Sequence, residues 1–349
     1  MSWGRSVPHR TFFWFILPSA LAMLLFIALP IVSVTVQSLY LEHEQVLIEV
    51  ENCGPFKCEK SVQVDIAATE ALKKAEPLGR FVGLDTYFDR GHLASKEVKA
   101  IWNETPDIGS FLDGLMNLPF YKALAFTLTY LFVVTPFVIV LGFAIALAVN
   151  TLHPIVKGPV IFASLLPMII TPLIGSLILF WMIDSRGVIG SGLQVLFDDP
   201  ELSLKASTPL TWIMLCVYGV WHSAPFAFVV FYAGLQTVPQ DTLESAMIDG
   251  ANRWERIRYV VIPYIMPLVT FVALMQLMDN FRVFEPIVGF SSSANATSLS
   301  WLIYNDLRPP DGIQRFGSAA STSLLTILGV IILLTPVLIR SWRDFHRAK

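Results

Sequence analysis

Long apolar segments separated by shorter polar ones make up most of this chain. A transmembrane helix needs roughly 20 mostly apolar residues, and we expect one at each segment of that length: 12–39, 120–150, 159–183, 209–236, 264–288 and 318–340. The first contains Pro18 and Pro30, which membrane helices tolerate because neighbouring groups satisfy the freed backbone. The pattern therefore predicts an all-α integral membrane protein with six transmembrane helices.

The composition supports this class. The 349 residues are 54% hydrophobic and 15% charged, with a mean hydropathy of +0.62, whereas soluble domains carry about 25% charged residues. We find no basic tract typical of nucleic-acid binding, no Gly-Lys-Ser or Gly-Lys-Thr phosphate loop, and no metal-ligand spacing among the six histidines. We therefore expect no enzymatic chemistry, no metal, no cofactor bound by this chain and no nucleic-acid partner.

Basic residues in short loops and tails indicate which ends of the helices face the cytoplasm. If six helices alternate, one side collects Arg5, Arg10, Lys157, Arg253, Arg256, Arg258, Arg340, Arg343, Arg347 and Lys349. We therefore expect both termini in the cytoplasm. The predicted organisation is 1–40, an N-terminal tail and first helix; 41–119, an extracytoplasmic loop or small lobe; 120–340, a core of five helices with a polar segment at 237–263; and 341–349, a cytoplasmic tail.

The 41–119 segment contains the candidate functional residues that we expect outside the membrane. Its acidic residues fit either a solvated surface or a docking surface for another protein. Cys53 and Cys58 flank the turn-forming Gly54 and Pro55. In an extracytoplasmic segment this spacing favours a short disulfide, and two unpaired thiols are the alternative.

The polar segment at 237–263, which we call the coupling segment, lies between two long apolar stretches. Asp241 followed by Glu244 predicts a capping box, so that a helix begins at Asp241. The apolar side chains downstream of it form a predicted stripe along one face of that helix: Leu243, Met247, Ala251 and Trp254. Taken alone, this pattern also fits an amphipathic helix lying on lipid headgroups.

The sequence Glu-Ser-Ala-Met-Ile-Asp-Gly-Ala at 244–251, followed after ten residues by Ile262-Pro263, resembles the Glu-Ala-Ala…Gly…Leu-Pro loop of binding-protein-dependent ABC importer permeases. Ser245 replaces Ala in that motif, and Ile257 stands where an aromatic residue is common. Further stretches resemble the carbohydrate permeases of the maltose and glycerol-3-phosphate transporters: Leu17-Pro18-Ser19, Leu29-Pro30, Phe81-Val82-Gly83-Leu84-Asp85-Thr86-Tyr87 and Gly234-Leu235-Gln236-Thr237-Val238-Pro239.

The resemblance implies an ABC importer permease fold with a cytoplasmic coupling helix that docks on an ATPase. The implied coupling residues are Glu244, Ser245, Ala246, Met247, Asp249, Gly250 and Ala251. The implied partners are a second permease subunit, a cytoplasmic ATPase dimer that binds ATP and Mg, an extracytoplasmic solute-binding protein, and membrane lipid. The implied location is the bacterial inner membrane.

The two apolar stretches beside the coupling segment carry polar groups at helical spacing. We expect these residues to line a substrate pocket: Gly219, His222, Ser223, Phe226, Gln276, Asp279, Asn280 and Val283. Ionisable groups in a bilayer normally face a bundle interior or a watery cavity. The alternative is that Asp279 and His222 pair with each other or with a neighbouring helix as structural contacts.

In the functional interpretation, these polar groups bind the hydroxyls of an uncharged solute, and Phe226 or Trp221 stacks on a sugar ring. Arg282 is predicted to pair with Glu285. The sequence thus predicts the permease subunit of an ATP-driven sugar or polyol importer. The alternatives are a proton-coupled secondary transporter, in which Asp279 and His222 relay protons, and an ABC permease for a non-sugar solute such as glycerol phosphate.

Overall fold

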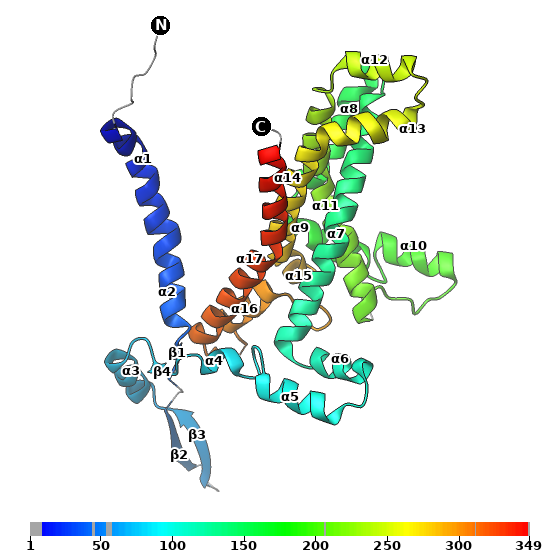
Figure 1. The fold of residues 1–349 in the computed structure, drawn as a ribbon. Helices are drawn as coiled ribbons and strands as arrows, with labels where there is room; N and C mark the ends of the chain where they lie inside the picture. Colours follow the sequence, from blue (N-terminus) through cyan, green and yellow to red (C-terminus); the bar gives the residue numbers. More distant parts are fainter. Residues whose placement is uncertain (1–8, 44–45, 54–57, 206, 311, 348–349) are drawn as a thin grey trace. The chain divides into compact units, whose positions relative to one another are not determined.

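The computed structural model describes residues 9–43, 46–53, 58–205, 207–310 and 312–347. The chain divides into two compact units. Unit 1 comprises residues 1–111 with 303–325, and unit 2 comprises residues 112–302 with 326–349. Both units are mainly helical (Figure 1), as predicted. Unit 1 adds two small sheets that the sequence analysis did not predict.

Unit 2 is built around two long helices that pack along each other, α7 and α11, with α14 beside them (Figure 1). Its elements are α7 (Pro119–Asn150), α8 (Pro154–Ile169), α9 (Pro172–Met182), α10 (Val188–Phe197), α11 (Thr208–Leu235), α12 (Gln240–Ile248), α13 (Arg253–Arg256), the π-helical turn η2 (Ile257–Val261), α14 (Ile262–Phe281) and α15 (Glu285–Gly289). Phe126, Val134, Phe228, Phe231 and Val272 are buried in the shared core. Close packing of α7 on α11 depends on Gly142, where an added Cβ would collide with Ala227.

Five helical stretches are long and apolar enough to cross a membrane: Phe12–Gln37, Pro119–Asn150, Thr208–Leu235, Arg253–Phe281 and Phe316–Arg340. The predicted span 159–183 is not one straight helix, because α8 and α9 meet at a bend of 95°. Pro172 disfavours helical backbone at the residue before it, and Thr171 is accordingly extended. If the bent pair counts as one span, the described helices supply up to six.

The predicted span 264–288 also differs from the structure. Its helix begins earlier, at Arg253, and ends at Phe281, so Glu285 belongs to the separate short helix α15. Arg282 ends the helix, with backbone angles outside the helical range. This early end places Val283 beyond the helix that carries Gln276 and Asn280.

Unit 1 contains the first apolar helical stretch and a small lobe. Its elements are α1 (His9–Met23), the π-helical turn η1 (Leu24–Ala28), α2 (Leu29–Gln37), β1 (Tyr40–Leu41), β2 (Leu47–Cys53), β3 (Cys58–Val64), α3 (Ile66–Ala75), β4 (Arg80–Phe81), α4 (Asp85–Phe88) and α5 (Ser95–Glu104). Three helices each have one part in unit 1 and one in unit 2: α6 (Ile108–Met116), α16 (Leu299–Leu307) and α17 (Phe316–Arg347).

Both sheets of unit 1 are antiparallel and two-stranded, β1 with β4 and β2 with β3. The register of the second places Cys53 opposite Cys58 along the backbone. The side chains of these two cysteines lie outside the described residues, so their disulfide remains a prediction. Hydrogen bonds at the end of α2 hold the lobe together: Tyr87 donates to the Ser38 hydroxyl at 2.6 Å, and Ser321 donates to the Ser38 carbonyl at 3.3 Å.

Candidate functional site

The coupling segment forms two short helices joined by a tight turn. Figure 1 shows α12 and α13 at the end of unit 2 where α7 ends and α8 begins. The turn reverses at Gly250, whose φ of +84° lies in the region that favours glycine. No atom would lie within 4 Å of a Cβ added at Gly250. Glycine is therefore needed there for its backbone conformation and not for space.

The predicted capping box at Asp241 is wrong. The helix α12 begins at Gln240, its cap residue is Pro239, and it has no side-chain cap. Because the helix starts after the proline, Glu244 lies too far along it to reach the cap. A capping box does occur one helix later, where the Asn252 amide donates to the Glu255 carboxylate at 2.7 Å and Asn252 Oδ1 accepts from the Glu255 amide at 3.0 Å.

The predicted apolar stripe is also not one helix face, because the turn at Gly250 separates Leu243 and Met247 from Trp254. Leu243 packs against the core, whereas Met247 is 49% exposed and Trp254 79% exposed. Ile248, which the sequence analysis missed, is 86% exposed. The two helices thus expose three large apolar side chains around one turn.

The coupling segment is tied to the rest of unit 2 at a few points. The Tyr264 hydroxyl of α14 donates a hydrogen bond to the Thr237 carbonyl at 2.8 Å. Leu243 of α12 packs against the hydrophobic core. Among the predicted coupling residues, Ala246 and Ala251 are half-buried, whereas Glu244, Ser245, Met247, Asp249 and Gly250 are exposed. The conformation of the segment is set by its own turn and caps, and its outer face is open to a partner.

A polar cavity of about 420 Å³ lies between α7, α9, α11, α14 and α15. Of the predicted pocket residues, His222, Ser223, Asp279, Asn280 and Val283 line it. The cavity is completed by residues that sequence reasoning did not place there: Tyr130, Pro172, Arg282, Glu285 and Pro286. Helical spacing grouped residues of one helix, but it carried no signal for the contribution of α7.

His222 has a specific contact within the chain. Its Nε2 lies 3.1 Å from the carbonyl oxygen of Ile170, the residue that ends α8 at the bend, so Nε2 donates the proton. Tyr218, one helical turn away, donates its hydroxyl to the Pro172 carbonyl at 2.8 Å. Carbonyl groups freed at a helix break need partners in an apolar environment. His222 and Tyr218 therefore stabilise the bend between α8 and α9.

Asp279 and His222 do not pair with each other. Asp279 accepts from Arg282 at 2.9 Å, so the predicted pairing of Arg282 with Glu285 is wrong. The reason is the early end of α14, which lets Arg282 fold back over the last turn while Glu285 starts a new helix. Asn280 is buried and donates its side-chain amide to the Thr135 hydroxyl of α7 at 3.0 Å.

Three predicted pocket residues are not among those that line the cavity. Gly219 is buried where an added Cβ would collide with the Tyr130 hydroxyl, so it makes room for that ring. The ring of Phe226 packs beside that of Phe271, with 6.5 Å between the two ring centroids. Gln276 is buried, and its Oε1 has no hydrogen-bond partner in the described part of the chain.

Trp221, one of the two predicted stacking residues, faces a different surface. It lines an apolar groove between α7 and α11 together with Val133, Phe137 and Val217. The aromatic residue at the polar cavity is Tyr130 instead. Across the described residues, no group of three or more His, Cys, Asp or Glu side chains is arranged to hold a metal ion.

A bundle of apolar helices with a polar cavity and an exposed helical turn between two of its helices defines a membrane transport subunit. Residues 108–342 match the family of binding-protein-dependent transport system inner membrane components. This chain belongs to that family, as the resemblance of residues 244–263 implied. It is therefore an inner-membrane permease component and not an enzyme.

Several relatives are sugar permeases. The trehalose transport system permease protein SugA of Mycobacterium tuberculosis is 31% identical over 64% of this chain and 71% of its own length. The trehalose/maltose transport system permease protein MalF of Thermococcus litoralis is 27% identical over 65% and 77%. The multiple sugar-binding transport system permease protein MsmF of Streptococcus mutans is 29% identical over 62% and 74%.

The fold agrees with that family. A chain from a bacterial ABC transporter involved in the import of the acidic polysaccharide alginate superimposes with a TM-score of 0.59 at 20% identity, covering 80% of this chain and 97% of that one. A second structure of a bacterial alginate ABC transporter, in complex with a periplasmic protein bound to an alginate pentasaccharide, gives 0.58 at 19% identity over 72% and 88%.

Proposed function

We propose that this chain forms, with a second permease subunit, the translocation path of an ATP-driven importer for an uncharged sugar or polyol. A solute-binding protein delivers the solute from outside, and an ATPase dimer that binds ATP and Mg drives the cycle. Membership of the family supports the transport role. The trehalose, maltose and multiple-sugar permeases among the relatives support the class of solute.

The orientation in this proposal follows the basic residues. Arg253, Arg256 and Arg258 of the coupling segment face the cytoplasm, with both chain termini on the same side. Residues 41–119 then lie outside, where a solute-binding protein docks. The exposed apolar face of the coupling segment meets a groove on the ATPase.

The polar cavity supports a neutral solute. Asp279 is paired with Arg282. The positive charge of Arg282 is therefore taken up by Asp279 and does not neutralise the Glu285 carboxylate. Because like charges repel, an anionic solute is disfavoured. The Ser223 hydroxyl and the Asn280 carboxamide offer hydrogen bonds to hydroxyl groups. The Tyr130 ring adds an aromatic side chain of the kind that lines small-molecule sites.

One observation carries the coupling: the exposed turn of α12 and α13 joins the two helices, α11 and α14, that contribute His222, Ser223, Asp279 and Asn280 to the cavity. Movement of the ATPase against Met247, Ile248 and Trp254 is transmitted directly to the ends of both helices. A change of exposure at His222 and Asp279 then follows from a rigid-body shift rather than from a local rearrangement.

The test is ATP-driven uptake of labelled trehalose and maltose into proteoliposomes that contain the complete transporter and its binding protein. Glu244→Lys is expected to abolish uptake without reducing the amount of assembled protein in the membrane. Asp241→Lys, which makes the same change of charge at an exposed position of α12 outside the motif, is the matched control and is expected to transport normally. Normal ATP-coupled uptake by the Glu244→Lys variant would refute the proposal.

The same vesicles separate this proposal from proton coupling. A protonophore is expected to leave uptake unchanged at saturating ATP, and removal of ATP is expected to stop it. The secondary-transporter alternative requires the opposite pair of results.

A further inference from the structure

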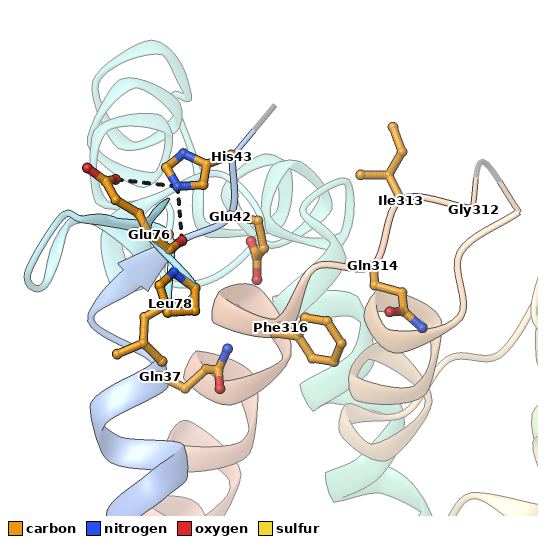
Figure 2. A pocket seen from close by; sticks show the side chains of 11 residues that line it. Gln37, Glu42, His43, Glu76, Leu78, Gly312, Ile313, Gln314 and Phe316 are labelled. Atoms are coloured by element: carbon orange, nitrogen blue, oxygen red, sulfur yellow. Dashed lines mark hydrogen bonds and ion pairs between the residues drawn. The ribbon is translucent and has the colours of Figure 1, made fainter. Parts of the chain in front are cut away.

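A second polar pocket lies within unit 1, at the end of α2. It has a volume of about 260 Å³. Four segments of the chain surround it: the last residue of α2, the stretch after β1, the connection from α3 to β4, and the stretch before α17. Its position at the end of an apolar span puts it at the membrane boundary, on the side of the 41–119 lobe. Figure 2 shows Gln37, Glu42 and Phe316 facing the same space.

Two of the polar groups of this pocket are held in place by the chain. The Glu42 carboxylate accepts the backbone N–H of Gly317 through one oxygen. His43 Nε2 lies 3.3 Å from the Glu76 carbonyl oxygen and 3.4 Å from its carboxylate (Figure 2). Because both partners only accept hydrogen bonds, Nε2 carries the proton. The carboxylates of Glu42 and Glu76 therefore have fixed surroundings before any ligand arrives.

Three further polar groups of the pocket are without a hydrogen-bond partner among the described residues. The carboxamides of Gln37 and Gln314 make no hydrogen bond within the part of the chain that the structure describes, and the second oxygen of Glu42 is likewise open. Leu78 and Phe316 supply apolar surface beside them. Small-molecule sites typically combine apolar surface with a few convergent polar groups. This pocket has that combination preformed.

We propose that this pocket binds one ring of an uncharged sugar at the outer end of the first apolar helical stretch. A sugar hydroxyl both donates and accepts hydrogen bonds, and a carboxamide does the same, so Gln37 and Gln314 match such a ligand. The open oxygen of Glu42 accepts from a hydroxyl in a charge-assisted bond. The apolar face of the ring rests on Phe316 and Leu78.

The chemistry of the pocket disfavours other ligands. Glu42 and Glu76 repel an anion. A cation uses only acceptors, and it would leave the amino groups of both carboxamides without partners. With a volume of about 260 Å³, the pocket lies below the usual range of sites for larger ligands, so it accommodates one sugar ring of a longer chain.

This inference rests on the proposed function for the class of solute and for the outward position of the lobe. The test uses the complete transporter in nanodiscs without its binding protein, with saturation-transfer NMR on glucose and on glucuronate. Glucuronate differs from glucose by a carboxylate in place of the terminal hydroxymethyl group. We expect a glucose signal at least three-fold stronger than that of glucuronate.

The double variant Gln37→Leu/Gln314→Leu is expected to lose most of the glucose signal. Asn103→Leu, which replaces an exposed carboxamide of α5 outside the pocket, is the matched control and is expected to keep it. Circular dichroism and uptake at saturating binding protein check that each variant is folded and assembled.

An equal glucose signal from wild type and from Gln37→Leu/Gln314→Leu would overturn the inference. So would a double variant that keeps the sugar signal but binds the solute-binding protein more weakly, because the pocket would then be a protein-docking surface. Failure of the proposed function has a different signature, since wild-type vesicles would take up no sugar at all.

Discussion

The coupling segment and the polar cavity of unit 2 differ in what their side chains contact. The coupling segment exposes Met247, Ile248 and Trp254 at its turn and packs on the bundle through Val238, Leu243 and Val261. Two polar groups of the cavity are held by other helices, His222 by Ile170 and Asn280 by Thr135, and Asp279 is paired with Arg282. The exposed side chains of the coupling segment need a partner outside this chain to cover them. The cavity residues are held by contacts within the chain.

This difference separates the expected effects of mutation. Changes in the coupling segment should interrupt transport and leave the stability of the isolated subunit nearly unchanged. Changes in the cavity should lower stability and transport together, because a buried polar group that loses its partner costs about 1–3 kcal/mol.

Gly250→Val should produce the largest loss of function. A β-branched residue at a φ of +84° is strained by roughly 1–3 kcal/mol, so the turn between α12 and α13 must change. We expect ATP-driven uptake to fall at least ten-fold while the thermal unfolding of the subunit in detergent changes little.

Gly250→Asn is the matched control, because asparagine tolerates positive φ better than other residues. It is expected to retain most of the uptake. Equal loss in both variants would mean that Gly250 serves close approach of the partner and not the backbone turn.

Asn280→Leu should destabilise the subunit and also reduce uptake. It removes the donor to Thr135, whose buried hydroxyl then lacks that bond, at an expected cost of about 1–3 kcal/mol. Thermal unfolding in detergent and uptake in vesicles measure the two effects separately.

Adding Thr135→Val to Asn280→Leu separates stability from solute binding. Replacing both partners by apolar groups of similar shape is close to neutral for stability, so the unfolding temperature should recover. Uptake should stay low, because the carboxamide is still missing from the cavity. Recovery of both would remove Asn280 from the solute site.

The same contrast explains what the sequence could predict. The coupling segment is a local motif, and residues 244–263 identified it without any long-range information. The predicted start of α12 was wrong, because the N-cap residue is Pro239 and not Asp241. The spacing of His222, Ser223, Asp279 and Asn280 also placed those residues at one cavity. Periodicity could not reveal Tyr130, which reaches the cavity through the packing of α7 against Gly219.

Other misses have local causes that the sequence did contain. Pro172 after Thr171 is a signal for a helix boundary, and it accounts for the bend that divides the predicted span 159–183. The pairing of Arg282 with Asp279 follows from the end of α14 at Phe281, and helix ends are hard to place from sequence. The strands that lead to Cys53 and from Cys58 were missed because two strands of seven residues each give only a short pattern in the sequence.

His222→Phe should have a smaller effect on stability than Asn280→Leu. It keeps an aromatic ring beside Tyr218 and removes the donor to the Ile170 carbonyl, and hydrogen bonds in membrane proteins contribute about 0.6 kcal/mol on average. We expect faster amide hydrogen exchange around residues 170–175 and a small decrease in unfolding temperature.

Tyr218→Phe provides the comparison for that variant, because it removes the neighbouring bond to Pro172. The double variant Tyr218→Phe/His222→Phe should show more than the sum of the two single effects, since the bend then lacks both donors. Strict additivity would mean that the two bonds act independently and that α8 and α9 hold their angle by packing alone.

Asp184→Asn should have the smallest effect, because it concerns a polar contact near the surface of unit 2. Asp184 accepts from Lys205 at 2.9 Å, and this hydrogen bond holds the pKa of the Asp184 carboxyl below its ordinary value of 3.8. A lowered pKa in the folded state stabilises the protein at neutral pH, and this contribution is lost as the pH falls below 3.8 through the folded pKa. The variant should therefore unfold at a slightly lower temperature than wild type at pH 7, and the difference should vanish in acid. Lys205 also lies 3.3 Å from the centre of the Phe180 ring, which limits the loss because this contact does not need Asp184. An undiminished difference below pH 3 would show that the side chain of Asp184 acts through packing and not through its charge.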